Sequence, residues 1–200
     1  MNFYEAADSL SGPILQVHEW IQEAQDGKVA LPHAMNIASL DSAGRPTSRM
    51  VLLKRISEEG FVFFTDYEGN KGKQISAFPH VALTFWWAKT NKQIRIEGEC
   101  SKVSEKENDE YFSSRPRGSQ ISASVSLQSQ ELESYESLTQ KSESFVKEYS
   151  NKTIERPERW GGFIVAPISI EFWIDQKNRL HKRELYSKSG TDWKKALLSP

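Results

Sequence analysis

The feature that most constrains the fold is a succession of short segments rich in β-branched and aromatic residues, separated by turn-forming residues. Such segments are typical of strands, and the turn signals at 41–44 and 89–92 suit connections between antiparallel neighbours. The predicted strands cover residues 34–40, 47–54, 61–65, 81–87, 93–103, 162–174 and 181–188. Many consecutive strands with a few inserted helices predict an antiparallel barrel with flanking helices, an α+β fold that is mainly β.

The inserted helices carry their own signals. Pro13 opens a predicted helix to Gln25 with apolar residues at helical spacing, and residues 70–78 form a short helix that stops before a proline. Ser104 is in position to cap a third helix, with Glu107 in the capping-box position. Further helices are predicted from near residue 118 and over residues 133–149.

Composition limits the classes of protein that remain. The chain has 200 residues, 38% of them hydrophobic, which suits one globular domain over residues 1–200, with residues 1–12 as a loosely packed N-terminal segment. A formal net charge of −1 argues against a nucleic-acid binder. The single cysteine, Cys100, excludes an internal disulfide, and no apolar run approaches the roughly 20 residues of a membrane span. We therefore expect a soluble cytoplasmic protein, and the histidine spacing predicts no metal site.

Cations gather near the C-terminus. Strand alternation would put Arg179, His181 and Arg183 on one face, with no acidic residue between them in the sequence. Such a face suits an anion or a flat, electron-rich ring. A solvated edge strand is the alternative interpretation.

Two further groups suit a phosphate. The β-prone run from Arg49 to Lys54 carries a cation at each end, while Tyr111, Arg115 and Ser119 recur at four-residue spacing. A phosphate needs charge-assisted donors that converge from different elements. We expect Tyr111 and Arg115 to share a helix face and Ser119 to lie at the start of the next helix, where the helix dipole favours an anion. The alternative is that these residues pack, lie on the surface and cap a helix.

Together these groups resemble the pyridoxamine 5'-phosphate oxidase family. The shared motifs, in order, are Arg-Met-Val-Leu-Leu-Lys at 49–54, Tyr-Phe-Ser-Ser-Arg-Pro at 111–116, and an ending with Trp-Gly-Gly at 160–162, Glu-Phe-Trp at 171–173 and Arg-Leu-His-Lys-Arg at 179–183. The resemblance covers roughly residues 13 to 200. It implies an FMN-binding split barrel of Greek-key type, a homodimer with FMN at the interface, and oxidation of a phosphorylated B6 vitamer by molecular oxygen to pyridoxal 5'-phosphate and hydrogen peroxide.

The resemblance also assigns roles to residues. It implies substrate contacts by Lys54, Tyr111, Arg115, Ser119, Arg179 and His181, of which Arg179 and His181 would sit over the reacting ring as catalytic residues. It implies FMN contacts by Arg49, Met50, Val51, Leu52, Lys54, Phe64, Thr65, Lys71, Gln93, Gln128, Ser129, Trp173 and Arg183. The residues alone give no flavin signal, because Gly69 to Lys73 lack the spacing of a phosphate-binding loop.

Four positions depart from the family pattern. Leu31 replaces an acid that helps receive the substrate, Asn70 replaces an arginine that supports the FMN phosphate, and Lys182 replaces an aspartate. The fourth departure is a lid segment that has no counterpart before Pro13. The alternatives that stay open are a related FMN oxidase of secondary metabolism, which acts on another amine or alcohol, and a non-catalytic binder of flavin or pyridoxal phosphate.

Overall fold

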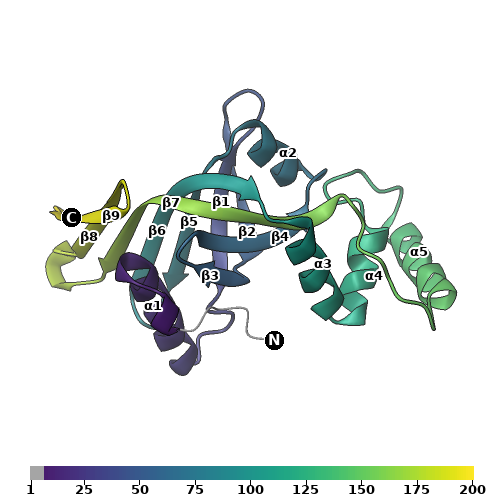
Figure 1. Cartoon of the computed structure of the whole chain (residues 1–200), viewed down its shortest axis with the longest axis horizontal. Helices are drawn as coiled ribbons and strands as arrows, with labels where there is room; N and C mark the ends of the chain where they lie inside the picture. The colour runs from purple at the N-terminus through teal and green to yellow at the C-terminus, as the bar shows by residue number, and fades with distance from the viewer. Residues whose placement is uncertain (1–6) are drawn as a thin grey trace.

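The structure is a computed structural model that describes residues 7–200. Its centre is an antiparallel sheet curled into a half-barrel, with helices around it (Figure 1). The strand order β2-β1-β5-β6-β7-β4-β3 continues from β7 into β8 and β9. The bounds are β1 Ala34–Leu40, β2 Pro46–Leu52, β3 Arg55–Ser57, β4 Gly60–Asp66, β5 His80–Trp87, β6 Lys92–Lys102, β7 Trp160–Ile174, β8 Lys182–Ser189 and β9 Asp192–Leu198. This confirms the predicted fold class and its β5–β6 hairpin.

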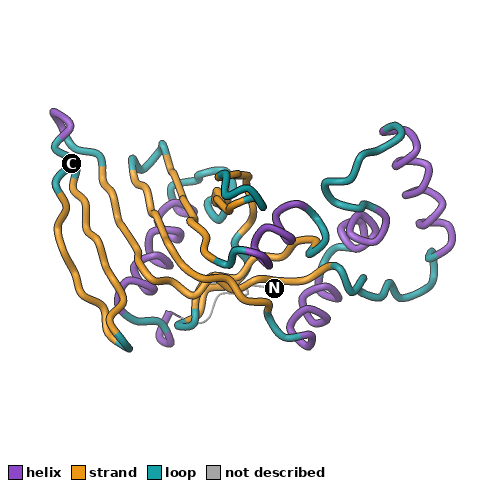
Figure 2. Tube along the Cα trace, turned by 90° about the horizontal axis from the view of Figure 1, so that it is seen from above, coloured by secondary structure: helices purple, strands orange, loops and turns teal. Residues whose placement is uncertain are grey.

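β7 organises the molecule because its two halves have different neighbours. One edge pairs with β6 along most of the strand. The other edge pairs with β4 over Trp160 to Val165 and with β8 over Ser169 to Ile174. Figures 1 and 2 show the consequence: the helices that lie between β6 and β7 in the sequence gather beyond the β4 end of β7, while β8 and β9 extend its other end.

The helices follow the predicted pattern closely. They are α1 Gly12–Asp26, α2 Asn70–Ala77, α3 Glu105–Ser114, α4 Arg117–Val125 and α5 Tyr135–Glu148. The Ser104 hydroxyl accepts the Glu107 N–H at 3.1 Å, which confirms the predicted cap. The Glu107 carboxylate does not close the capping box, because it accepts from Arg55 Nε at 3.0 Å. None of the described helices is long and apolar enough to cross a membrane.

The sequence prediction missed two strands and misplaced one boundary. β3 is only three residues long, and β9 carries two adjacent lysines, so neither has a clear strand pattern. β8 begins at Lys182 because residues Lys177–Arg179 form a 3-10 turn, in which Asn178 and Arg179 have positive φ. Of the predicted loose N-terminal segment, residues 1–6 lie outside the described residues, Ala7–Ser9 forms a short 3-10 helix, and Leu10 is buried.

A buried polar cluster ties α3 to β7. Asn108 is fully buried, and its side-chain oxygen accepts the Gly162 N–H at 2.7 Å. Its amide group donates to the Tyr67 hydroxyl at 3.3 Å, and that hydroxyl donates to the Gly162 carbonyl at 3.0 Å. A side chain at Gly161 would meet Tyr67 Oη at 2.2 Å, so a glycine is required where β7 passes this cluster.

Replacing Asn108 with leucine should therefore destabilise the fold. The leucine leaves the Gly162 N–H without an acceptor, and an unsatisfied buried donor costs about 1–3 kcal/mol. Urea unfolding measures the loss. Ser113→Ala, on the exposed side of the same helix, is the control and should change the free energy of unfolding by less than about 0.5 kcal/mol. An Asn108→Leu protein as stable as the unmodified chain would contradict this account.

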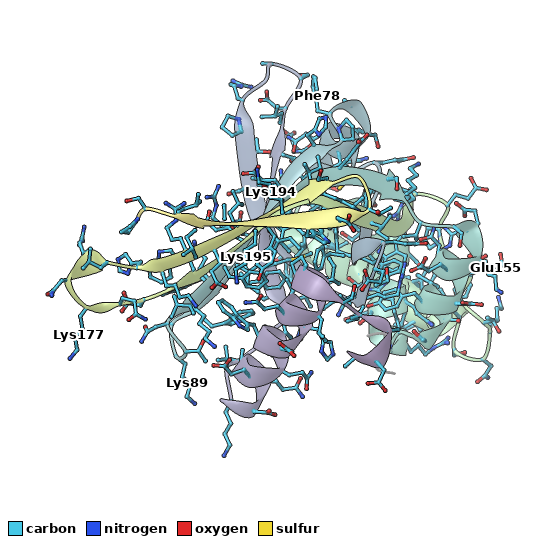
Figure 3. The ribbon with its side chains drawn as sticks, turned by 60° about the vertical axis from the view of Figure 1, so that its left-hand side comes forward. Phe78, Lys89, Glu155, Lys177, Lys194 and Lys195 are labelled. Atoms are coloured by element: carbon cyan, nitrogen blue, oxygen red, sulfur yellow. The ribbon has the colours of Figure 1, made fainter. Side chains whose placement is uncertain are left out.

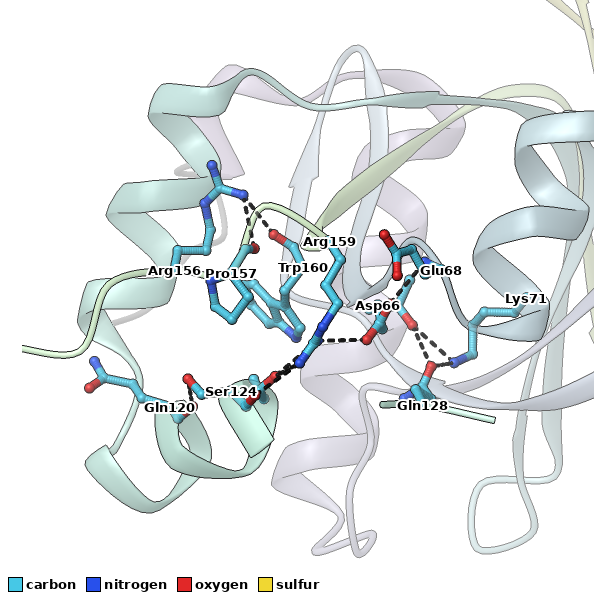
Figure 4. Close-up of polar contacts among 12 residues, drawn as sticks. Asp66, Glu68, Lys71, Gln120, Ser124, Gln128, Arg156, Pro157, Arg159 and Trp160 are labelled. Carbon is cyan, nitrogen blue, oxygen red and sulfur yellow. Dashed lines mark hydrogen bonds and ion pairs between the residues drawn. The ribbon is translucent and has the colours of Figure 1, made fainter. Parts of the chain in front are cut away.

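Two arginines just before β7, Arg156 and Arg159, connect this part of the chain to α3 and α4 (Figure 4). Arg156 pairs with Asp109 at 2.6 Å and with Glu105, both on α3. Arg159 pairs with the buried Asp66 at 2.8 Å and donates to the carbonyls of Ala123 and Ser124 on α4. Since α3 and α4 carry the predicted phosphate-binding residues, these contacts fix the helices against the barrel.

Candidate functional site

A hollow of roughly 400 Å3 lies beside the half-barrel where α3 packs against it. Lys54, which lies between β2 and β3, contributes to its wall, as do Phe64 on β4 and Tyr111 on α3. Lys54 is held in place by its backbone, because its N–H donates to the Val62 carbonyl at 2.8 Å. The rest of the lining comes from Arg55, Ser104, Lys106, Glu107 and Glu110.

Three parallel aromatic rings form a tier at this hollow, and two of them belong to its wall. Phe64 stacks on Tyr111 with ring centroids 3.9 Å apart, and the ring of Trp160 lies 5.4 Å from Phe64 and 6.0 Å from Tyr111. The planes of the Tyr111 and Trp160 rings differ by only 6°. Burial raises the pKa of the Tyr111 hydroxyl, so this group stays a neutral donor.

Arg115 lies against the same tier. Its guanidinium carbon is 4.3 Å from the centre of the Trp160 ring, and its Nη1 is buried without a hydrogen-bond partner among the described residues. Burial lowers the pKa of Arg115, and burial together with the charge of Arg115 lowers the pKa of Lys54. Two cations therefore lie close together, and no carboxylate in residues 7–200 forms an ion pair with either. A buried donor without a partner beside a second cation suits an anion.

Ser119 is the third residue of α4 and is close in sequence to Arg115. Its backbone N–H donates to the Pro116 carbonyl at 2.8 Å. The expected backbone donor is therefore engaged within the helix start, and the Ser119 hydroxyl is the group that remains for a ligand.

A second set of donors surrounds Arg49 on β2. Its guanidinium donates to Ser39 Oγ at 2.7 Å, to Thr47 Oγ1 at 2.8 Å and to Gln74 Oε1 at 2.8 Å. Desolvation by burial lowers the pKa of Arg49. Gln74 is a residue that the sequence reasoning missed, although it lies three positions after Lys71 on α2 and so shares a helix face with it.

Lys71 belongs to the same set. Its ammonium group donates to Gln128 Oε1 (Figure 4). It also donates to Thr65 Oγ1 at 2.9 Å, and Thr65 donates to Gln128 Oε1 at 3.0 Å. Burial lowers the pKa of Lys71, and so does the charge of Arg49, while Asp66 opposes the shift. Two cations with hydroxyl and amide groups between them have the donor chemistry of a phosphate cradle. Ser129 follows Gln128 in an exposed loop with a φ of 70°.

β2 presents an apolar surface beside this cradle. β2 is an edge strand, on which Arg49 and Val51 are half-buried, while Met50 is 62% exposed and Leu52 is exposed as well. An exposed methionine on an edge strand is the kind of surface that a ring or another chain covers.

The remaining predicted site residues lie at the far end of β7. Gln93 on β6 pairs in register with Trp173, and Trp173 pairs in register with Arg183 on β8. The Trp173 ring lies 5.9 Å from the 51%-exposed Trp86 and 4.5 Å from the ring of His181. In Figure 3, Lys177 in the β7–β8 connection and Glu155 on the helical side lie on opposite sides of the molecule.

The prediction of one cationic strand face was wrong. Arg179 and His181 precede the strand, and Arg179 lies in the 3-10 turn with a φ of 60°. Two of the three residues also lie beside acidic side chains, 12 and 6 residues earlier in the chain. Arg183 forms two hydrogen bonds with the buried Glu171, of 2.7 and 3.1 Å, and His181 Nδ1 lies 3.0 Å from the Asp175 carboxylate. Arg179 is exposed and forms no ion pair in the described part of the chain.

The two ends of β7 are too far apart to hold one ligand. Trp173 is thirteen steps along the strand from Trp160, which at about 3.3 Å per residue is roughly 40 Å. The cluster of Lys54, Tyr111 and Arg115 lies near the first end, and Arg179 and His181 follow the second. One chain alone does not bring the predicted substrate residues together.

The departures from the family pattern occupy exposed positions. Leu31 is exposed with a φ of 52°, Asn70 is the exposed first residue of α2, and Lys182 pairs with Glu184 at 2.8 Å. His33, two residues after Leu31, is half-buried, and burial and the charge of Lys54 lower its pKa.

The family comparisons match nearly the whole chain. A family model described as pyridoxamine 5'-phosphate oxidase matches residues 21–146, and one described as pyridoxine 5'-phosphate oxidase C-terminal dimerisation region matches residues 160–200. A protein of Nostoc punctiforme named pyridoxine/pyridoxamine 5'-phosphate oxidase is 45% identical over 94% of this chain and 88% of its own length. A protein of the same name from Haemophilus influenzae is 44% identical over 96% of this chain and 91% of its own length.

Solved structures agree on the fold. PhzG from Burkholderia lata, in complex with tetrahydrophenazine-1-carboxylic acid, has a TM-score of 0.90 at 30% identity, over 96% of this chain and 95% of that one. A pyridoxamine 5'-phosphate oxidase-related, FMN-binding protein from Nostoc punctiforme has a TM-score of 0.78 at 14% identity, over 96% of this chain and 99% of that one. The second likeness bears on the fold alone.

Proposed function

The chain belongs to the pyridoxamine 5'-phosphate oxidase family, and we propose that it oxidises pyridoxamine or pyridoxine 5'-phosphate to pyridoxal 5'-phosphate, with oxygen as acceptor. The observation that carries the proposal is the buried Arg115 Nη1, which has no partner in the described chain, close to the charge of Lys54. The substrate phosphate would neutralise both cations and accept the unused hydrogen bond. Tyr111 and Ser119 would add neutral donors to the same phosphate.

The Arg49–Lys71 cradle would hold the phosphate of FMN. Its side chains supply two positive charges and uncharged donors, which fits a dianion. Met50, Val51, Leu52, Phe64 and Thr65 would line the flavin beside the cradle, and Gln128 and Ser129 would close it, as the family resemblance implies. Bound FMN supplies hydride acceptance and reoxidation by oxygen.

A homodimer would complete the site. The match to a C-terminal dimerisation region over residues 160–200 covers β7, β8 and β9, and the two ends of β7 cannot meet within one chain. We therefore propose that each site is shared between two protomers. One protomer supplies the phosphate pocket, and its partner supplies Gln93, Trp173, Arg179, His181 and Arg183. There, the Arg179 guanidinium would stack on the substrate ring, and His181 would form hydrogen bonds with the substituents of that ring. Both contacts would fix the orientation of the reacting carbon.

Anaerobic reduction tests the proposal directly. The purified protein should be yellow with bound FMN, and anaerobic pyridoxamine 5'-phosphate should bleach the colour and yield pyridoxal 5'-phosphate. Readmitted oxygen should restore the colour. A colourless protein that does not take up FMN would exclude the flavin, and a yellow protein that never bleaches with either vitamer would leave a binder, not an oxidase.

A related oxidase of secondary metabolism is the second candidate, because the PhzG structure matches closely. The cations Lys54 and Arg115 favour a phosphate, since a dianion balances both charges, whereas the single carboxylate of tetrahydrophenazine-1-carboxylic acid would balance only one. Oxygen consumption with phosphorylated vitamers and with tetrahydrophenazine-1-carboxylic acid compares the two candidates. Full activity at low micromolar pyridoxamine 5'-phosphate would also refute the idea that the changes at Leu31, Asn70 and Lys182 alter the substrate.

Ligand affinity should fall in alkaline solution. Burial and Arg115 hold the pKa of Lys54 below its usual value of 10.5, and a bound phosphate dianion stabilises the protonated form. Binding therefore favours protonated Lys54, so the dissociation constant of pyridoxal 5'-phosphate should rise as pH passes upward through the lowered pKa. Isothermal titration across this range measures the trend. Lys54→Arg, which stays charged, should flatten it, and an equal slope in both proteins would assign the effect elsewhere.

A further inference from the structure

We propose that Trp160 is a positioning residue of the phosphate pocket, which acts by holding the Arg115 guanidinium against its ring. The inference rests on the proposed function, because it takes the pocket of Lys54, Tyr111 and Arg115 as the site of the substrate phosphate. Trp160 itself is buried behind the pocket and would not contact the phosphate.

Arg115 needs such a support because its own helix does not supply one. It is the C-cap of α3, with an extended backbone (φ −71°, ψ 147°), and Pro116 follows it. No carboxylate pairs with its guanidinium anywhere in residues 7–200, and the Nη1 atom has no hydrogen-bond partner there. The contacts that the structure gives this guanidinium are aromatic, to Trp160 at 4.3 Å and to Phe112 at 5.8 Å.

Trp160 is well placed to be a fixed platform. It is the first residue of β7 and pairs in register with Asp66 on β4. Its backbone N–H donates to the Pro157 carbonyl at 2.8 Å, and its backbone carbonyl accepts from Arg156 Nη1 at 2.8 Å. The edge of the Phe112 ring packs against it, with centroids 5.3 Å apart. These contacts fix the Trp160 main chain and pack its ring against Phe112, and none of them involves Arg115.

The same ring aligns the second phosphate donor. Tyr111 lies parallel to Trp160, and Phe64 stacks on Tyr111 within the same tier. A cation over an indole face is attracted to it, and this attraction strengthens when water is excluded. One anchored indole therefore sets the direction of the buried Nη1 donor and the plane of the Tyr111 ring before a ligand arrives. Pre-ordering of this kind lowers the entropy that binding must remove.

A double-mutant cycle tests the inference with the FMN-loaded protein and pyridoxal 5'-phosphate as the probe. Trp160→Leu should weaken pyridoxal 5'-phosphate binding about 5- to 30-fold, the range of a desolvated cation–π contact, while Trp160→Phe should restore most of the affinity. In an Arg115→Met background, Trp160→Leu should change the dissociation constant by less than about 2-fold. KM should rise with little change in kcat. Loss of affinity that is equally large without Arg115, or unchanged affinity in Trp160→Leu, would overturn the inference.

Fluorinated tryptophan supplies a version of the test that preserves side-chain volume, in case Trp160→Leu does not fold. Incorporated at all six tryptophan positions, it weakens the electrostatic attraction of each ring face. Affinity for pyridoxal 5'-phosphate should fall further in the otherwise unmodified chain than in Arg115→Met, where any loss comes from the other tryptophans, and equal losses in both would refute the role of Trp160. Failure of the unmodified protein to bind pyridoxal 5'-phosphate or inorganic phosphate would instead refute the proposed function.

Discussion

Replacing Arg115 with methionine should raise the KM for pyridoxamine 5'-phosphate about 10- to 150-fold, because a hydrogen bond to a charged group contributes about 1.5–3 kcal/mol. Arg115 presents a buried Nη1 that meets no acceptor in the described chain, so its removal leaves no other group unpaired. The loss should therefore appear in substrate binding and not in stability. Steady-state kinetics and urea unfolding, measured on the same preparation, separate the two.

Arg117→Met is the matched control for this experiment. Arg117 lies two residues further along the chain, but its guanidinium donates to the carbonyls of Tyr149 and Lys152, on the side of α5. Its replacement should leave the KM within about 2-fold of the unmodified value, since its guanidinium contacts the carbonyls at the end of α5 and not the aromatic rings beside Arg115. A KM for Arg115→Met that equals the control would mean that the phosphate lies elsewhere.

Replacing Arg159 with methionine should lower the free energy of unfolding by about 3–5 kcal/mol, the usual cost of stranding one member of a buried ion pair. The side chains of Arg159 and Asp66 are only 13% and 5% exposed, and the two groups are 2.8 Å apart. Arg159 also donates to the carbonyls of Ala123 and Ser124, so its loss frees α4 from the barrel. Urea unfolding followed by tryptophan fluorescence measures the change.

Arg45→Met supplies the comparison. Arg45 also pairs with an aspartate at 2.8 Å, but its side chain is 78% exposed in the β1–β2 turn. An exposed pair of this kind contributes about 0–1 kcal/mol, so the control should unfold almost as the unmodified protein does. Similar losses in the two variants would show that burial of the Asp66–Arg159 pair does not govern its contribution.

Both predictions concern the end of the sheet at which β7 begins. The substrate phosphate would be bound by side chains from the β2–β3 connection, α3 and α4, and both helices are held at the start of β7. Asn108, Arg156 and Arg159 hold the helices there, and the Arg115 guanidinium lies over the Trp160 ring. We therefore expect Arg159→Met to lower stability and Arg115→Met to lower affinity for the ligand, although the two residues belong to the same end of the sheet.

Local patterns in the sequence were enough for most of the elements. Alternating apolar residues located β5 and β6, helical spacing located α1, and Ser104 located the start of α3. These signals are reliable because strand alternation, helix periodicity and capping depend on residues close together in the chain. The family motifs likewise identified the cations, whose chemistry is a property of the residue type.

Only the tertiary structure decided what those cations face. Glu171 meets Arg183, and Asp175 meets His181, although the sequence suggested a face without acids. Arg49 and Lys71 approach each other from β2 and α2, and Gln74 joins them. The length of β7 keeps the predicted phosphate-binding residues apart from Arg179 and His181 within one chain. Such relations depend on strand register and on how distant segments pack, and no local periodicity records them.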